Sequence, residues 1–173
     1  MKITMIEYPT ERDWLEVKRR ALVTVGLDVK NPPSYEWKRK ILRARHSPIR
    51  RLHFSFLLEN IPSWVSVHLC RHIHAQPYVK SQRNDRQQDY DRNKAPQDQP
   101  VNMIFDLNGE ALLNIANKRL CMMASPETRE VVREICRLVI EKCPEFDGFL
   151  VPMCEYHNGV CYEFNGGCGK YAE

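Results

Sequence analysis

The sequence lacks any run of about 18 apolar residues, so no membrane-spanning helix and no membrane partner are predicted. Residues 1–14 contain no apolar stretch, so no secretory signal peptide is expected. Internal repeats and low-complexity tracts are also lacking. These absences predict a cytoplasmic protein, in which the seven cysteines stay reduced rather than forming disulfides.

What the chain does contain is typical of a globular protein. Its 173 residues suffice for one domain with a sizeable core, and a hydrophobic share of 43% argues against disorder. The 26 basic and 22 acidic residues give a net charge of +4, which is too small to indicate nucleic-acid binding. No nucleic-acid partner is therefore expected, although the basic residues would suit an anionic ligand such as a nucleotide phosphate.

Apolar residues at helical spacing predict several helices. A capping box at Thr10 and Asp13 precedes the first, and Ser125 with Pro126 precedes the last long one. The apolar stripe of that last helix, which should face the core, is Val131, Val132, Ile135, Leu138 and Val139. The other predicted helix starts are Ser34, Pro62 with Ser63, and Asn108 or Gly109.

Between these helices lie one clear strand and a long polar segment. Leu52, Phe54, Phe56 and Leu58 occupy alternate positions, as in a half-buried strand. Residues 76–81 are expected to be extended, and the turn-rich residues 81–100 to form a long loop. This order favours an α+β fold. We expect one domain over residues 1–150, with a cysteine-rich tail, residues 151–173, packed on it.

One predicted helix has a cationic face. His68, Arg71 and His72 stand at i, i+3 and i+4, and Ser81 and Arg83 follow shortly after the helix. Arginine offers a planar fork of donors that never loses its charge, so this group could bind a phosphate or an ionised base. The alternative from spacing alone is a helix face in water.

The same residues resemble the signature of the flavin-dependent thymidylate synthases. That signature is Arg-His-Arg, seven further residues, then Ser; here Arg71, His72, Ile73 and Ser81 match it except at the third position. The family has another arginine two residues after the serine, and Arg83 stands there.

The resemblance continues on both sides of the signature. Downstream, Asn108, Asn114 and Arg119 reproduce the family's gaps of six and five residues. Upstream, the segments His-Ser-Pro at 46–48 and Phe-Ser-Phe at 54–56 are also similar. For residues 1–150 this resemblance implies a small antiparallel sheet flanked by helices.

The resemblance implies an enzyme that converts dUMP to dTMP by reductive methylation. FAD is the implied cofactor, methylenetetrahydrofolate and NADPH are the implied co-substrates, and a homotetramer with shared active sites is the implied assembly. Arg119 is implied as the catalytic residue, which contacts the uracil and stabilises its ionised form. The implied dUMP-binding residues are His68, Arg71, Ser81, Gln82, Arg83, Arg119 and Arg92, with Arg86 as an alternative to Arg92. The implied FAD-binding residues are Ser47, Arg71, His72, Asn108, Glu110 and Asn114.

Four positions depart from the family pattern. Ile73 replaces the third signature arginine, Val79 replaces a glutamate, His68 replaces a glutamine, and Glu110 stands where an arginine is usual. Three alternatives stay open: a nucleotide- or flavin-binding relative without turnover, a relative that transfers another one-carbon unit to a pyrimidine nucleotide, and a small basic nucleic-acid-binding module.

The cysteines of the tail are evenly spaced. Cys154, Cys161 and Cys168 have six residues between successive members, and Cys121 could supply a fourth ligand. Four thiolates suit a structural zinc ion, although the gaps differ from the close pairs of ordinary zinc sites. An iron–sulfur cluster and reduced thiols without a ligand are the other interpretations. The remaining cysteines, at positions 70, 136 and 143, lie on helical patterns and are expected in the core.

Overall fold

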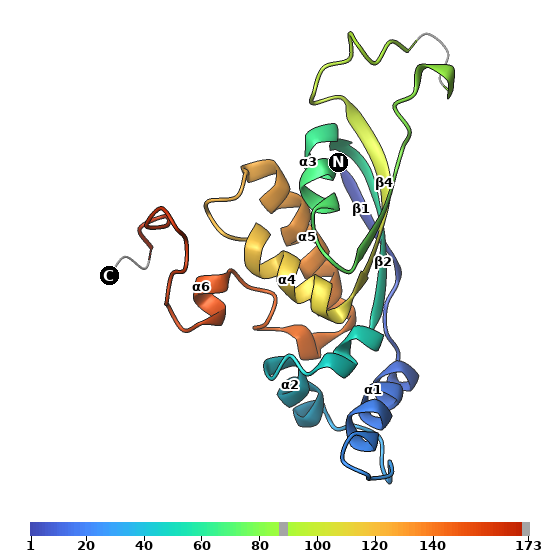
Figure 1. Ribbon diagram of the computed structural model, residues 1–173, viewed down its shortest axis with the longest axis vertical. Helices are drawn as coiled ribbons and strands as arrows, with labels where there is room; N and C mark the ends of the chain where they lie inside the picture. The colour runs from blue at the N-terminus through green and yellow to red at the C-terminus, as the bar shows by residue number, and fades with distance from the viewer. Residues whose placement is uncertain (87–89, 171–173) are drawn as a thin grey trace.

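The computed structural model describes residues 1–86 and 90–170, which form an antiparallel sheet with helices packed on one face (Figure 1). The strands are β1 (Lys2–Glu7), β2 (His53–Pro62), β3 (Ala75–Val79) and β4 (Pro100–Asn108). Their spatial order is β1-β2-β4-β3, and each neighbouring pair is antiparallel. The predicted α+β class with a small antiparallel sheet is confirmed.

Alternation along the two central strands builds the buried face of the sheet. Phe56 of β2 and Phe105 of β4 face each other in register, and both are fully buried. On β4 the side chains of Asn102 and Ile104 point to the opposite, exposed face. A strand with this alternation is stable when only one face is covered. Of these strands, β2 was predicted from the sequence, but β1 and β4 were not.

The helices are close to those predicted. Side-chain caps are present at three of the predicted starts: Thr10 and Asp13 form their capping box, and Ser34 and Asn108 accept hydrogen bonds from the third residue after each. Ser125 stands at the N-cap of the last long helix as predicted, but its side chain makes no cap hydrogen bond. The α-helices are α1 (Glu11–Val23), α2 (Tyr35–Arg43), α3 (Ser63–Cys70), α4 (Gly109–Arg119), α5 (Pro126–Lys142) and α6 (Met153–Tyr156). The 3-10 helices are η1 (Ser47–Arg51), η2 (Asn84–Arg86) and η3 (Pro144–Phe146). Over residues 1–86 and 90–170, none of the helices is both long enough and apolar enough to cross a bilayer.

The core lies between the sheet and the helices α4 and α5, and it extends to α1 through aromatic contacts. The ring of Phe146 in η3 stands edge-on to Phe54 of β2, with centroids 5.4 Å apart, and lies 6.3 Å from Trp14 of α1. All three side chains are buried. On α5 the predicted stripe is buried except for Leu138, which is only partly buried, whereas Cys136 is buried.

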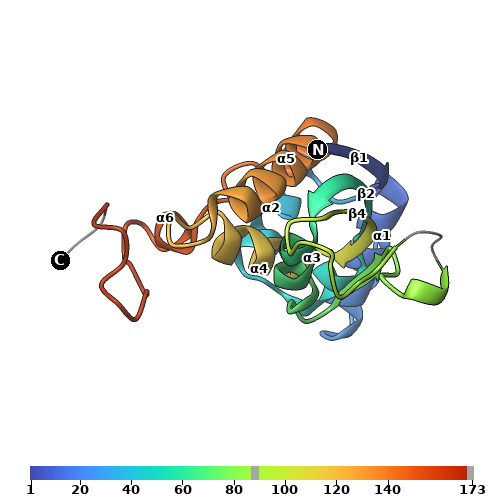
Figure 2. The ribbon, with the colours of Figure 1, turned by 90° about the horizontal axis from the view of Figure 1, so that it is seen from above.

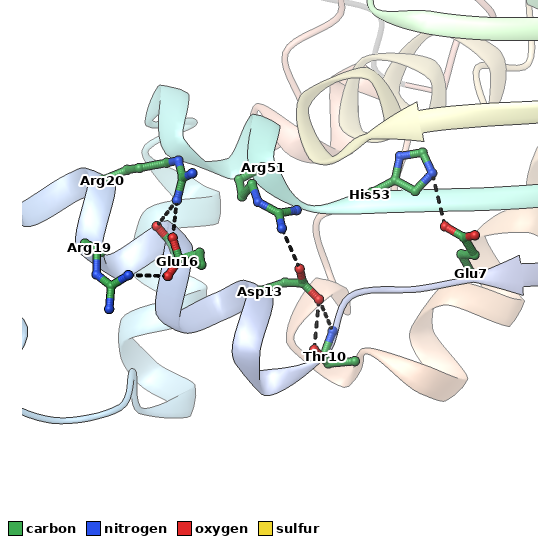
Figure 3. Close-up of polar contacts among 8 residues, drawn as sticks. All are labelled: Glu7, Thr10, Asp13, Glu16, Arg19, Arg20, Arg51 and His53. Atoms are coloured by element: carbon green, nitrogen blue, oxygen red, sulfur yellow. Dashed lines mark hydrogen bonds and ion pairs between the residues drawn. The ribbon is translucent and has the colours of Figure 1, made fainter.

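Polar contacts join the start of α1 to the segment before β2 (Figure 3). Arg51 at the end of η1 forms an ion pair of 3.2 Å with Asp13, and His53 lies 3.4 Å from Glu7 at the end of β1. The side chains of Arg51, His53 and Glu7 are largely exposed. Such exposed pairs stabilise a fold by only about 0–1 kcal/mol each, so the aromatic contacts dominate here.

Two segments project from this body. Residues after β3 leave the sheet at the end opposite α4, at the top of Figure 1. The tail leaves on the side of α4 and α6, as Figure 2 also shows. The predicted loop 81–100 includes residues 87–89, and the predicted tail includes residues 171–173; both triplets lie outside the described residues.

Candidate nucleotide site

The structure brings the signature helix and the downstream triplet together where α3 and α4 both end. Arg119, the last residue of α4, donates a hydrogen bond from Nε to Nε2 of His72 at 2.8 Å. Its Nη2 donates to the main-chain carbonyl oxygen of His68 at 2.9 Å. Two elements 47 residues apart in sequence are therefore joined through one guanidinium group.

A second guanidinium lies near the first. Arg71 caps the C-terminal end of α3 and is exposed. Burial, and then the positive charge of Arg71, lower the pKa of Arg119. Burial and both arginines likewise lower the pKa of His68. Because like charges repel, the approach of an anion stabilises this arrangement.

His72 is held in its neutral form. Its Nε2 accepts a hydrogen bond from Arg119, which requires that this nitrogen carry no proton. Burial, followed by the positive charge of Arg119, lowers the pKa of His72 from 6.5 to about 4. At neutral pH the imidazole therefore orients Arg119 without adding charge to the site.

This lowered pKa predicts a loss of stability in mild acid. The unfolded chain binds a proton at His72 below about pH 6.5, whereas the folded chain binds one only below about pH 4. The stabilisation of the folded state by neutral His72 is therefore complete above pH 6.5 and is lost as the pH falls toward 4. Allowing for partial exposure, the loss should be on the order of 2 kcal/mol. In urea unfolding at several pH values, His72→Gln, which keeps an acceptor but does not titrate, should show less of this decline. Equal declines in both proteins would contradict the assignment.

His68 is fixed by contacts that the sequence did not suggest. Its Nδ1 lies 3.0 Å from Oγ1 of Thr128, a fully buried residue in the first turn of α5. Ser125 in turn donates to Thr128 at 2.8 Å. The ring of Trp64 stands edge-on to His68 at 5.3 Å. No spacing rule in the sequence links Thr128 to the signature.

A small cavity opens beside Arg119. It measures about 290 Å³, and the polar groups in its wall include His72, Lys118, Arg119 and Glu163. The wall is thus formed by the end of α3, the end of α4 and the tail. Both residues of the Arg119–His72 hydrogen bond face this cavity.

The predicted phosphate-binding residues lie away from Arg119, near the other end of α3. Gln82 donates from Nε2 to the hydroxyl of Ser63, the first residue of α3, at 2.9 Å. Because α3 has eight residues, this contact is about 12 Å along the helix from Arg71. Arg83 is exposed and forms an ion pair with Asp85 at 2.5 Å. Within the described chain, no contact brings Arg83 to the Arg71–Arg119 pair.

Exposed groups flank Arg83 on the same segment. The hydroxyl of Ser81 accepts from the main-chain N–H of Arg83 at 3.4 Å. The main-chain N–H of Arg92 donates to the side-chain oxygen of Asn84 at 2.9 Å, and the Arg92 side chain is exposed. Arg86, the alternative to Arg92, is exposed in η2. The segment can therefore present several cations to an anion outside this chain's own Arg119 cavity.

Three of the predicted flavin-binding residues, Ser47, Asn108 and Glu110, lie at the end of α4 opposite Arg119. Asn108 caps this helix by accepting from the N–H of Ala111, and Glu110 pairs with Arg50 of η1. Ser47 is exposed at the start of η1. Arg119 stands eleven positions after Asn108, which corresponds to about 16 Å along the helix.

Asn114, midway along α4, belongs to a network that sequence reasoning missed. Its side-chain oxygen accepts from Nη1 of Arg45 at 2.7 Å, and Arg45 also donates to the buried Asn117. The Arg45 guanidinium lies 4.5 Å from the centroid of the Tyr156 ring in α6. Arg45 has a left-handed φ of 48°, and no sequence pattern at this position predicts that conformation.

Comparison with known proteins identifies the fold. The family model described as thymidylate synthase complementing protein matches residues 85–145. A crystal structure of thymidylate synthase X from Helicobacter pylori with FAD and dUMP superposes with a TM-score of 0.69, at 13% identity, covering 87% of this chain and 99% of the other. A second structure of the Helicobacter pylori enzyme with FAD and dUMP gives 0.64, at 14% identity, covering 79% and 93%. No curated protein sequence matches this chain.

The chain has the fold of a flavin-dependent thymidylate synthase. The fold implied by the resemblance in the sequence is thereby confirmed. The family model includes the triplet Asn108, Asn114 and Arg119, but its match begins after the signature from Arg71 to Ser81. That signature is the part in which this chain departs from the thymidylate synthase pattern at Ile73 and Val79. Ile73 is 77% exposed and Val79 is 37% exposed, so neither substitution serves core packing.

Five of the seven cysteines in this thymidylate synthase fold line one cavity between the tail and α5: Cys121, Cys136, Cys154, Cys161 and Cys168. In residues 1–86 and 90–170, however, no three metal-binding side chains lie close enough together to enclose an ion. Cys136 and Cys143 are buried as predicted, but the prediction for Cys70 is wrong: this residue is exposed, because Leu69 instead faces the core at the end of α3.

Proposed function

We propose that this protein is a flavin-dependent thymidylate synthase that converts dUMP to dTMP with methylenetetrahydrofolate and NADPH. The observation that carries the proposal is the meeting of Arg71, His72 and Arg119 at the ends of α3 and α4. The shared fold supports it, because the two similar structures were both determined with FAD and dUMP.

Arg119 is the proposed catalytic residue. Carbon 5 of uracil is a weak nucleophile until the ring carries negative charge, and a fixed guanidinium beside N3 and O4 stabilises that charge. His72 and the His68 carbonyl hold the guanidinium in place before the substrate arrives. Such preorganisation avoids a reorganisation cost during the reaction. Arg71 adds a second positive charge toward the nucleotide.

The FAD, when bound, would supply the hydride, and the protein would provide binding and orientation. The residues proposed to hold it, Arg71 and His72 at one end of α4 and Asn108, Glu110 and Asn114 toward the other, extend over about 16 Å. This spread fits an extended dinucleotide. The Asn114 side chain is engaged by Arg45, and Glu110 by Arg50, so these positions are fixed by neighbouring cations.

We further propose that the sites are shared between subunits of a homotetramer. Within one chain the segment with Ser81, Gln82, Arg83 and Arg92 lies at the far end of α3 from Arg119. A phosphate-binding role for Arg83 toward the same nucleotide therefore calls for Arg83 from one subunit and Arg119 from another. Crosslinking or light scattering of the purified protein would test for four copies.

A second candidate function is a relative that binds flavin and nucleotide without turnover. The exposed Ile73 and Val79 favour it, because a charged ligand contact is absent at both positions. A relative that transfers another one-carbon unit to the pyrimidine is the remaining possibility within the enzyme class.

Absorption spectroscopy separates these candidates. The purified protein should show the visible bands of bound FAD, those bands should shift on addition of dUMP, and NADPH oxidation should depend on dUMP. Mass analysis of the nucleotide product should show a methyl group. Bound flavin without dUMP-dependent oxidation would favour the inactive relative. Absence of flavin binding would reject the proposal.

A further inference from the structure

Glu110 carries the wrong charge for a residue that contacts the diphosphate of FAD. A carboxylate cannot donate a hydrogen bond to a phosphate oxygen, and its negative charge repels the phosphate. The hydrogen bond from Arg50 lowers the pKa of Glu110, so this carboxylate is ionised at neutral pH. An arginine is usual at this position in the family that the sequence resembles. Binding of FAD at this end of α4 therefore needs a cation from another residue.

Arg50 of η1 stands directly beside Glu110. Its Nε donates a hydrogen bond to Oε2 of Glu110. A guanidinium has five N–H donors, and the Arg50 side chain is 51% exposed. It can therefore donate to a phosphate oxygen while it stays paired with Glu110.

Close packing of η1 on α4 holds this arginine in place. The main-chain N–H of Gly109, the first residue of α4, donates to the carbonyl oxygen of Leu52 at 2.9 Å. A Cβ added to Gly109 would stand 2.7 Å from the carbonyl oxygen of Ile49, the residue before Arg50. Only glycine lets the main chain of η1 approach α4 so closely. The backbone that carries Arg50 is therefore fixed against the first turn of α4.

Two further basic side chains lie close to Glu110. After the hydrogen bond from Arg50, the charges of His74 and Arg45 also lower the pKa of this carboxylate. Residues 72–74 therefore lead from the cavity at the far end of α4, which His72 lines, to the end where Glu110 stands. Basic groups thus accompany the whole length over which FAD is proposed to extend.

We propose that Arg50 is a FAD-binding residue, which supplies the cation for the diphosphate of FAD, and that Glu110 is a positioning residue that orients it. The positive charge then reaches the flavin site from η1 and not from the first turn of α4. This inference rests on the proposed function. It names a residue that neither the signature nor the downstream triplet contains.

Binding of FAD to the full chain, followed by the quenching of flavin fluorescence, tests the role of Arg50. Arg50→Ala should raise the Kd for FAD about tenfold or more, the usual effect of losing one hydrogen bond to a charged group. The Kd for riboflavin, which has the same ring system but no phosphate, should not change. Arg51→Ala is the matched control, because this neighbouring arginine pairs with Asp13 instead. It should bind FAD like the wild type.

A charge-swapped protein, Arg50→Glu with Glu110→Arg, separates the charge from its position. The swap keeps the ion pair and moves the cation to position 110, so FAD affinity should stay close to that of the wild type, whereas Arg50→Glu alone should lose most of it. An Arg50→Ala protein that binds FAD like the wild type, or that loses FAD and riboflavin equally, would overturn the inference. A wild-type protein without affinity for FAD would reject the proposed function itself, and this inference with it.

Discussion

Replacing Arg119 with alanine is expected to lower the rate of dTMP formation by about 10²–10³-fold, the effect of removing one preorganised donor from a developing anion. The guanidinium is held by His72 and by the His68 carbonyl, so its loss removes charge from the pocket and also frees both partners. Steady-state dTMP formation, measured by mass, gives the turnover number. Arg119→Lys should recover little of the lost rate of dTMP formation, because an ammonium cannot reproduce the planar fork of donors of a guanidinium.

The matched control for this experiment is Arg43→Ala. Arg43 is an exposed arginine at the end of α2, and its carbonyl, rather than its side chain, accepts from Tyr156. This variant should turn over like the wild type. Circular dichroism should show both variants folded. Turnover in Arg119→Ala within threefold of the wild type would remove Arg119 from the catalytic role.

Replacing Phe146 with alanine is expected to destabilise the fold by about 3–5 kcal/mol, the usual cost of truncating a buried phenylalanine. Phe146 is fully buried and contacts Phe54 of β2 and Trp14 of α1. The cavity left behind would lie where the sheet, α1 and η3 meet. Because no part of that region can collapse without moving the sheet, recovery by relaxation should be small.

The control here is Phe164→Ala, at a fully exposed phenylalanine of the tail. It should change the free energy of unfolding by less than about 0.5 kcal/mol. Urea unfolding, followed by fluorescence and circular dichroism, gives both values. A Phe146 variant within 1 kcal/mol of the wild type, or equal effects at the two positions, would show that this cluster is not the centre of the core.

The helices were predictable because their ends carry local signals. Thr10 with Asp13, Ser34 and Asn108 each satisfy main-chain donors through their own side chains, and those interactions involve residues only three apart. Strands β1 and β4 were missed although Ile3 with Met5, and Val101 with Phe105, alternate as a strand requires. In β4 the apolar Ile104 on the exposed face blurs that alternation.

The candidate site was predictable in its residue types but not in its arrangement. The signature and the downstream triplet pointed to Arg71, His72 and Arg119. The structure joins His72 to Arg119 by a hydrogen bond and brings Arg71 near enough for its charge, after the larger effect of burial, to lower the pKa of Arg119. The roles of Thr128 and Arg45 could not be predicted from the sequence, because each contacts a residue tens of positions away in the chain. The distance of Arg83 from Arg119 could not be found either, because it depends on the direction of β3 away from α3.

The central claim is that a pyrimidine nucleotide binds against Arg119 at the junction of α3 and α4, beneath a flavin. A crystal structure of this protein with FAD and dUMP tests it most directly. We predict that the Arg119 guanidinium lies within hydrogen-bond distance of uracil N3 and O4, with Arg83 of a neighbouring subunit at the phosphate. A nucleotide bound away from the Arg71–Arg119 pair would contradict the account.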